Sequence, residues 1–207
     1  MCRKVLPWLA IAMLFLPLVI DAQKQTPLDI ALRHIEHKAS DWSLSSSDIQ
    51  EAKVSHQFQS KHNQLTHYYL LQHHQGIEVE GAIVGVHIKR DGKVGYATSR
   101  FVGDLGEKIK ATTANMDALT AIQKAIAHLN LPEDQSIQFE EKEAEHAYVF
   151  SPGKTAATKI RVQLLYWPRP DTDAVELAWR VHLQEASRSL KVWDILVDAQ
   201  EGQILHQ

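Results

Sequence analysis

The stretch YYLLQHHQGIEVEGAIVGVHIKRDGKVGYA, residues 68–97, carries the signals of an antiparallel meander. Gly76 marks a turn, and residues 83–89 then alternate between apolar and polar side chains, which is typical of a half-buried strand. Asp91-Gly92 is the pattern of a two-residue β-hairpin turn, and residues 94–102 would form the return strand. The stretch therefore predicts antiparallel strands joined by short turns.

The segment before the meander predicts a helix over residues 26–42. Thr26 can cap its start, Pro27 suits its first position, and apolar residues recur at helical spacing. Two strands are predicted between this helix and the meander, at residues 54–59 and 65–72. The helix is thus available to cover one face of the sheet.

The second half repeats this order. A helix is predicted over residues 113–129, with Thr113 as its cap and Pro132 as its end. Its apolar stripe consists of Ala118, Ala121, Ile122, Ala125, Ile126 and Leu129. Strand-like segments follow at residues 136–150, 159–167, 175–184, 190–198 and 203–206.

Because strands do not alternate with helices, we expect an α+β fold rather than a doubly wound parallel sheet. It should consist of two cystatin-like halves after a signal peptide, each half a helix plus an antiparallel sheet. The expected units are residues 1–22, 23–105 and 106–207.

The first 22 residues have the layout of a cleaved export signal: a basic start, an apolar run over residues 5–20 and a small residue, Ala22. A retained membrane anchor is the alternative, but this run is shorter than the roughly 20 residues needed to span a bilayer. The single cysteine, Cys2, lies in this segment, so no disulfide is expected in the exported part. We expect a secreted or periplasmic protein without a stable membrane anchor.

Composition and motifs argue against several functions. The net charge of −3 at pH 7 gives no electrostatic case for binding nucleic acid. His34 and His37 lie on the first helix, but the His-Glu-x-x-His pattern of zinc proteases does not occur in the sequence. His73 and His74 are neighbours on a strand, so their side chains point to opposite faces. We interpret all four as structural or solvent-facing, and we expect no catalytic, cofactor-binding or metal-binding residue.

Residues 48–97 resemble the fungalysin/thermolysin propeptide domain, the FTP domain. The family pattern is a strand that ends near a glutamine, a Gly-Ile-x-Val turn, an alternating strand and an Asp-Gly hairpin. These features occur here in the same order and at the expected spacing. The family-motif positions that we regard as structural are Gln75, Gly76, Ile77, Val79, Gly81, Asp91 and Gly92.

The second half resembles the PepSY-type half of the same propeptides. In that half an Ala-Trp-Arg-Val strand, which contains Trp179 here, precedes a Val-Asp-Ala-x-x-Gly turn. Asp198 can bond the backbone of this turn, and Gly202 can adopt the positive φ that closes it. We expect Trp179 and Trp193 to pack between sheet and helix. The resemblance covers most of residues 27–206.

The resemblance implies a non-catalytic propeptide that inhibits a zinc metalloprotease and assists its folding, in cis or in trans. The catalytic domain of that family does not occur within these 207 residues, so no catalytic residue can be carried over. The segment 202–207 is where such a propeptide would meet its protease. This makes Ile204, Leu205 and His206 candidate contact or clip positions, and His206 a candidate for reaching the partner's zinc. A simple final strand is the alternative for Ile204 and Leu205.

Other functions stay open at this point. The chain can be part of a truncated zymogen or a free-standing inhibitor. It can also be a cell-envelope binding module of PepSY type that is unrelated to a protease. A metal-binding protein is a third class, and it rests only on the twelve histidines.

Overall fold

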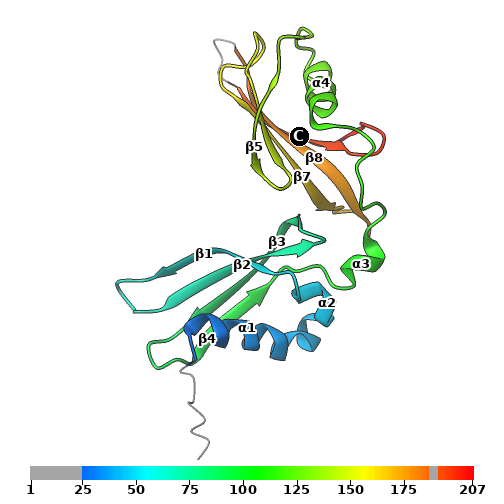
Figure 1. Ribbon diagram of the computed structural model, residues 1–207. Coiled ribbons are helices and arrows are strands. Elements are labelled where there is room, and N and C mark those ends of the chain that lie inside the picture. Colours follow the sequence, from blue (N-terminus) through cyan, green and yellow to red (C-terminus); the bar gives the residue numbers. More distant parts are fainter. Residues whose placement is uncertain (1–24, 187–190) are drawn as a thin grey trace, which may run out of the picture.

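The computed structural model describes residues 25–186 and 191–207. The expected signal peptide, residues 1–22, lies outside these described residues. Figure 1 shows two halves, each with one longer helix beside a set of strands. The strands pair mostly antiparallel and the helices are few, which confirms the α+β class.

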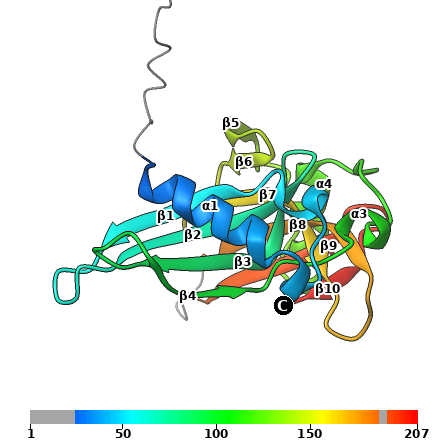
Figure 2. The same ribbon diagram turned by 90° about the horizontal axis from the view of Figure 1, so that it is seen from below.

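The first half places its helices before its strands. In chain order its elements are α1 (Pro27–Lys38), the 3₁₀-helix η1 (Ser40–Trp42), α2 (Ser46–Ile49), β1 (Lys53–Gln59), β2 (Thr66–His74), β3 (Ile77–Ile88) and β4 (Val94–Ser99). Strand β2 pairs with β1 and β3, and β3 pairs with β4, all antiparallel. Figure 2 shows α1 lying across these strands.

The second half follows the same plan. Its elements are α3 (Leu105–Lys108), α4 (Ala118–His128), β5 (Phe139–Ala144), β6 (Ala147–Phe150), β7 (Ile160–Pro168), β8 (Val175–Gln184), β9 (Val192–Asp198) and β10 (Ile204–His206). Each of these strands pairs antiparallel with the next along the chain. The strand-like segment expected over residues 136–150 consists of β5 and β6, because a turn at Glu145 and His146 divides it.

One parallel contact joins the two sets of strands into a ten-stranded sheet. It pairs Val79 of β3 with Tyr166 of β7. Strand β3 is therefore shared: its first residues lie beside the second half, and its later residues lie between β2 and β4.

Local chemistry explains where α1 begins. The Thr26 hydroxyl accepts a hydrogen bond from the backbone N–H of Asp29, and the Asp29 carboxylate accepts one from the backbone N–H of Thr26. This capping box satisfies two N–H groups that the first turn leaves free. Pro27 occupies the first helical position, where its missing N–H costs nothing.

The core of the first half lies between α1 and its sheet. Ala31 and Ile35 of α1 are buried in the same cluster as Val84, Val86 and Ile88 of β3. Complete burial of a valine or isoleucine side chain contributes roughly 1.5–3 kcal/mol. Because side chains alternate along a strand, the residues between these valines project from the sheet face opposite α1.

The Asp-Gly hairpin forms between β3 and β4, but its turn differs from the two-residue type. Gly92 has a φ of 80°, whereas Asp91 is not among the described residues with positive φ. The N–H of Gly92 donates to the carbonyl of Lys89, and the N–H of Lys89 donates to the carbonyl of Lys93. The loop is thus a turn that ends on a left-handed glycine, the geometry of a longer hairpin connection.

The second helix starts later than expected. Asp117, not Thr113, is the N-cap of α4, and its carboxylate accepts the backbone N–H of Thr120 at 2.7 Å. Aspartate is at least as good a cap as threonine. Asp117 immediately precedes the apolar stripe, and Thr113 does not, so the helix starts at Asp117. The five alanine and isoleucine residues of that stripe are buried as predicted.

No helix within the described residues is long and apolar enough to cross a membrane.

Candidate functional site

The β2–β3 turn is the first place where family-motif residues meet. Gln75 and Gly76 have φ values of 50° and 79°, so the hairpin closes on two left-handed residues. The Glu51 carboxylate accepts both of their N–H groups, at 2.9 and 2.8 Å. The bond from Gly76 is the main reason that the pKa of Glu51 lies below its usual value. The Glu51 carboxylate, which precedes β1 in the chain, therefore stabilises the turn.

This turn lies against the second half of the molecule. A Cβ atom on Gly76 would lie 3.5 Å from the Glu145 carboxylate and 3.8 Å from Nε2 of His146. The rings of His74 and Tyr166 are 5.9 Å apart. Side chains from the β5–β6 turn and from β7 therefore enclose the hairpin tip.

The next motif residues extend this junction. Ile77 and Val79 are buried, and Val79 makes the parallel pairing with β7. Gly81 follows with a φ of 67° on the exposed side of β3. Asp91 and Gly92 lie apart from the others, at the β3–β4 hairpin. Five of the seven FTP-motif positions therefore cluster where the two halves meet.

Tyr166 offers a test of the junction. Its ring is fully buried, and its hydroxyl has no hydrogen-bond partner among the described residues. Burial raises the pKa of this hydroxyl, and the Glu51 carboxylate adds to the effect. We expect Tyr166→Phe to leave the free energy of unfolding unchanged or to raise it by up to about 1 kcal/mol, because it removes a buried unpaired group. Urea unfolding measures this, and a loss above about 1 kcal/mol would show that the hydroxyl has a partner.

The C-terminal residues form strand β10, which pairs antiparallel with β9. Ile204 packs on the main core cluster, and Leu205 packs on a second cluster made of Leu165, Ala178 and Leu196. Ile204 and Leu205 therefore lie in a final strand, which was the alternative to a clip position. A protease could cut there only after β10 left β9, because bound substrates need a free extended backbone.

His206 lies beside Trp167 on this face of the second half. Their rings stack with centroids 6.2 Å apart. Arg180 forms an ion pair with Glu80 of β3 close by. Around them lies an open hollow of about 630 Å³, lined by Glu80, Arg180, Val192, Trp193, Asp194, Leu196, His206 and Gln207. Its lining mixes both signs of charge with apolar surface.

The turn before β10 has the geometry that its sequence suggests. The Asp198 carboxylate accepts the N–H groups of Gln200 and Glu201, at 2.7 and 2.6 Å. Gly202 has a φ of 77° and donates its N–H to the Asp198 carbonyl. The turn therefore directs β10 back along β9.

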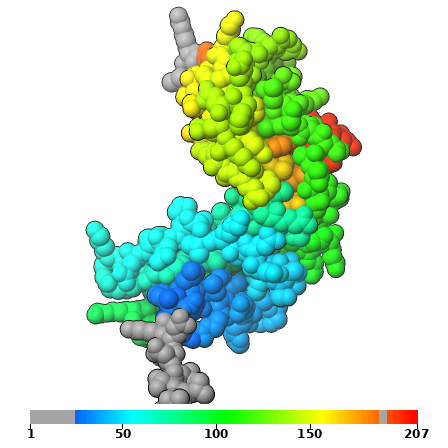
Figure 3. All heavy atoms as spheres, in the orientation of Figure 1, coloured from blue at the N-terminus to red at the C-terminus, as the bar shows by residue number. Residues whose placement is uncertain are grey.

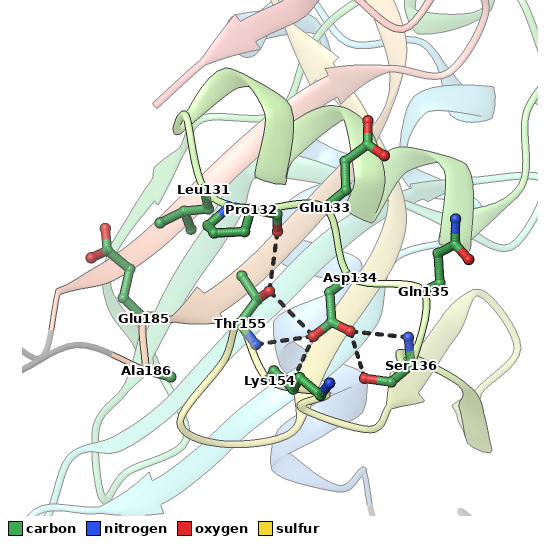
Figure 4. A pocket seen from close by; sticks show the side chains of 10 residues that line it. All are labelled: Leu131, Pro132, Glu133, Asp134, Gln135, Ser136, Lys154, Thr155, Glu185 and Ala186. Carbon is green, nitrogen blue, oxygen red and sulfur yellow. Dashed lines mark hydrogen bonds between the residues drawn. The ribbon is translucent and has the colours of Figure 1, made fainter.

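A second hollow, of about 540 Å³, lies beside the loop that follows α4 (Figure 4). Its centre is the Asp134 carboxylate, which accepts N–H groups from Ser136, Lys154 and Thr155 and the hydroxyls of Ser136 and Thr155. These bonds, above all the one from the Ser136 hydroxyl, lower the pKa of Asp134 strongly. Because both oxygens of the Asp134 carboxylate accept hydrogen bonds, the carboxylate holds two loops together and has no free oxygen for acid–base chemistry.

His34 and His37 lie on α1, and His73 and His74 lie at the end of β2. The described residues contain no group of three or more histidine, cysteine, aspartate or glutamate side chains that could hold a metal ion. His37 is exposed, and His34 is half-buried.

Three residues whose roles depend on long-range contacts were not predicted from the sequence: Glu51 at the hairpin tip, Asp48 in α2 and Gln72 in β2. Asp48 accepts the N–H groups of Ser45, Asp104 and Leu105. Gln72 exchanges two hydrogen bonds with the backbone of Val102. The Asp48 capping pattern was readable from Ser45 three residues earlier, but its distant partners were not.

Comparison with known proteins gives a family match within the first half. Residues 50–101 match the family described as Fungalysin/Thermolysin Propeptide Motif. This range runs from just before β1 to just after β4, and it contains Glu51 and the hairpin tip.

The chain is also similar to extracellular fungal metalloproteinases. It is 29% identical over 147 residues to extracellular metalloproteinase mep of Aspergillus terreus, and 27% identical over 147 residues to that of Aspergillus fumigatus. It is 28% identical over 149 residues to extracellular metalloproteinase NpIII of Aspergillus oryzae. Each match covers 70% of this chain but only 22–23% of the relative.

These comparisons agree with the expected resemblance. The chain carries the propeptide motif and is homologous to fungalysin-type metalloproteinases over 70% of its length. It spans about a quarter of the length of the curated relatives that it matches. Their catalytic domains are not contained in these 207 residues. The alternative of an envelope module unrelated to a protease is not favoured by these matches.

Proposed function

We propose that this chain, with its propeptide motif, is the propeptide region of a secreted zinc metalloprotease of fungalysin/thermolysin type, and that it inhibits that enzyme and assists its folding. The observation that carries the proposal is the coincidence of the motif, residues 50–101, with the sheet β1–β4 and with the junction to the second half. The similarity of 147 residues to metalloproteinases is longer than this motif and therefore continues beyond it.

The proposed organisation is a signal peptide over residues 1–22, an FTP-like part over 23–105 and a PepSY-like part over 106–207. Each of the two later parts would be cystatin-like, with one helix beside an antiparallel sheet. The extracellular relatives support secretion. In this organisation the chain acts as a zymogen's propeptide or as an inhibitor in trans.

The physical basis of folding assistance is linkage. A propeptide that binds the folded protease, but not the unfolded one, stabilises the folded state in proportion to the logarithm of its concentration over its Kd. A propeptide that also covers the cleft excludes substrate. We propose that Ile204, Leu205 and His206 at the C-terminal face belong to the contact, where the mixed charges of Glu80 and Arg180 could pair with polar groups of the partner.

The test uses the mature enzyme of the A. terreus extracellular metalloproteinase and the full secreted chain. We expect the chain to inhibit peptide hydrolysis with a dissociation constant in the nanomolar to micromolar range, as for protein interfaces of ordinary size. We also expect it to raise the activity recovered when the denatured enzyme is refolded. Heat-unfolded chain is the control, and it should do neither.

The two activities can be separated. Inhibition without improved refolding would mean that the chain acts only as an inhibitor. Improved refolding without inhibition would mean that it acts only in folding. If the chain neither binds the enzyme nor changes its refolding, the proposed function is wrong.

A further inference from the structure

The sheet face opposite α1 carries a row of four rings, one from each strand of the first half. Phe58 of β1, His67 of β2, His87 of β3 and Tyr96 of β4 are cross-strand partners in the sheet register. Their ring centroids are 4.6, 4.7 and 3.9 Å apart in that order. We call these four residues the ring row.

The ring row is unusual for an outward sheet face. The face of an antiparallel sheet that turns away from the core is normally polar and solvated. Here Phe58 and Tyr96 are 50% and 53% exposed. Tyr69 adds a further ring, with its centroid 5.7 Å from that of His87. An exposed aromatic surface of this kind marks an interaction site.

The two histidines of the row are in direct contact. Their Nδ1 atoms are 2.6 Å apart, and His87 is only 4% exposed. In such a contact one Nδ1 donates a proton and the other accepts it, which fails when both imidazoles are charged, because both are then donors. The groups that face His87 are His67 and Tyr69 on β2 and Tyr96 on β4, while α1 lies on the other face.

The row lies on the side of the sheet toward the second half. Figure 1 shows α1 beneath the first sheet and the second half above it. In the space-filling view of Figure 3 the outline is hollowed between the two halves, on the side where β1 and β2 lie. A partner that touched both halves would therefore meet this face of the first sheet.

We propose that the ring row is a docking surface for the catalytic part of a fungalysin-type metalloprotease, and that acidification releases this contact by charging the buried imidazole of His87. The inference rests on the proposed function. The occupant follows from the comparisons: the matched segment is 22–23% of the relatives, so in those proteins it folds beside a much larger remainder of a metalloproteinase. A neutral aromatic row is complementary to an uncharged, apolar patch on that remainder.

The direction of the pH effect follows from the site. Burial, and then the neighbouring His67, hold the pKa of His87 below its usual value of 6.5. His87 is therefore uncharged at neutral pH and takes up a proton only in more acidic solution. Charging it places a cation against an apolar surface. Affinity should be full at neutral pH and fall as the pH drops below 6.5.

The experiment measures the Kd of the full chain for an inactive variant of the mature A. terreus enzyme at pH about 7.5 and about 5. We expect the wild-type chain to bind at least about tenfold more weakly at the lower pH. The double variant F58A/Y96A should bind about tenfold more weakly at the higher pH, because aromatic anchors dominate interfaces. His87→Gln removes the titrating imidazole and should reduce the pH effect to within about threefold.

His34→Gln is the matched control. His34 is also a half-buried histidine whose pKa burial lowers, but it lies on α1, on the other side of the sheet from the ring row, so this variant should keep both the affinity and its pH dependence. Circular dichroism checks that each variant is folded, and F58A/Y96A carries the test if His87→Gln is not. Unchanged binding by F58A/Y96A to an enzyme that the wild type binds would refute the docking surface alone. Equal wild-type affinity at both pH values would refute the release. If the wild type does not bind at any pH, the proposed function itself fails.

Discussion

Replacing Trp179 by alanine is expected to lower the free energy of unfolding by about 3–5 kcal/mol, the usual cost of truncating a buried tryptophan. Trp179 of β8 is 5% exposed and belongs to the main core cluster. Its ring lies 5.9 Å from that of Tyr148, and its Nε1 donates to the carbonyl of Met116 at 3.1 Å. Truncation therefore leaves a cavity between the sheet and α4, and it also frees the segment that leads into that helix.

Urea unfolding of the secreted chain measures this effect, and Trp193→Ala is the matched control. Trp193 of β9 is only partly buried, although its Nε1 also donates a hydrogen bond, to Glu185 at 2.7 Å. We expect Trp193→Ala to lower the free energy of unfolding by about 1–2 kcal/mol, because Trp193 buries less apolar surface on folding than Trp179 does. If Trp179→Ala cost no more than Trp193→Ala, the packing of α4 on the second sheet would be wrong.

The sequence predicted those features of the fold whose causes are local. Thr26, Pro27 and Asp29 are neighbours in the chain, so the start of α1 could be read directly from their capping pattern. The hairpin at Gly92 was predictable for the same reason, although its turn type was not. Which of several turns forms depends on the register of β3 against β4, and register depends on the packing of the whole sheet.

The candidate surfaces could not be predicted in this way. His67 and His87 are twenty residues apart, and only the register of β2 against β3 brings their Nδ1 atoms together. Glu51 and Gly76 are likewise 25 residues apart in the chain. No sequence pattern distinguishes these residues from solvent-facing ones, because the groups that they contact lie far away in the chain. The family resemblance identified Gly76 as important, and the structure adds what it touches.

Asp48 is expected to be the most sensitive charged residue of the first half. Asp48→Ala should cost about 3 kcal/mol at neutral pH, because it leaves several buried donors unpaired. Asp48 is 2% exposed, and its carboxylate accepts the N–H groups of Ser45 and Leu105 at 2.8 and 2.9 Å and that of Asp104 at 3.0 Å. It thereby joins α2 to the segment that connects the two halves. Urea unfolding at 25 °C measures the loss.

The pH dependence of this loss separates a charge effect from a packing effect. Burial would raise the pKa of Asp48, but hydrogen bonds from the backbone of Ser45 and Leu105 outweigh it, so the pKa lies below 3.8. A carboxyl group with a lowered pKa stabilises the folded state above its unfolded pKa, and this stability is lost as the pH falls through the folded pKa. The difference between wild type and Asp48→Ala should therefore shrink as the pH falls below 3.8. Asp48→Asn, which keeps one acceptor oxygen, should lose less than the alanine variant. A difference that stays constant with pH would mean that Asp48 acts through its shape alone, and that the ionised carboxylate does not hold the two halves in place.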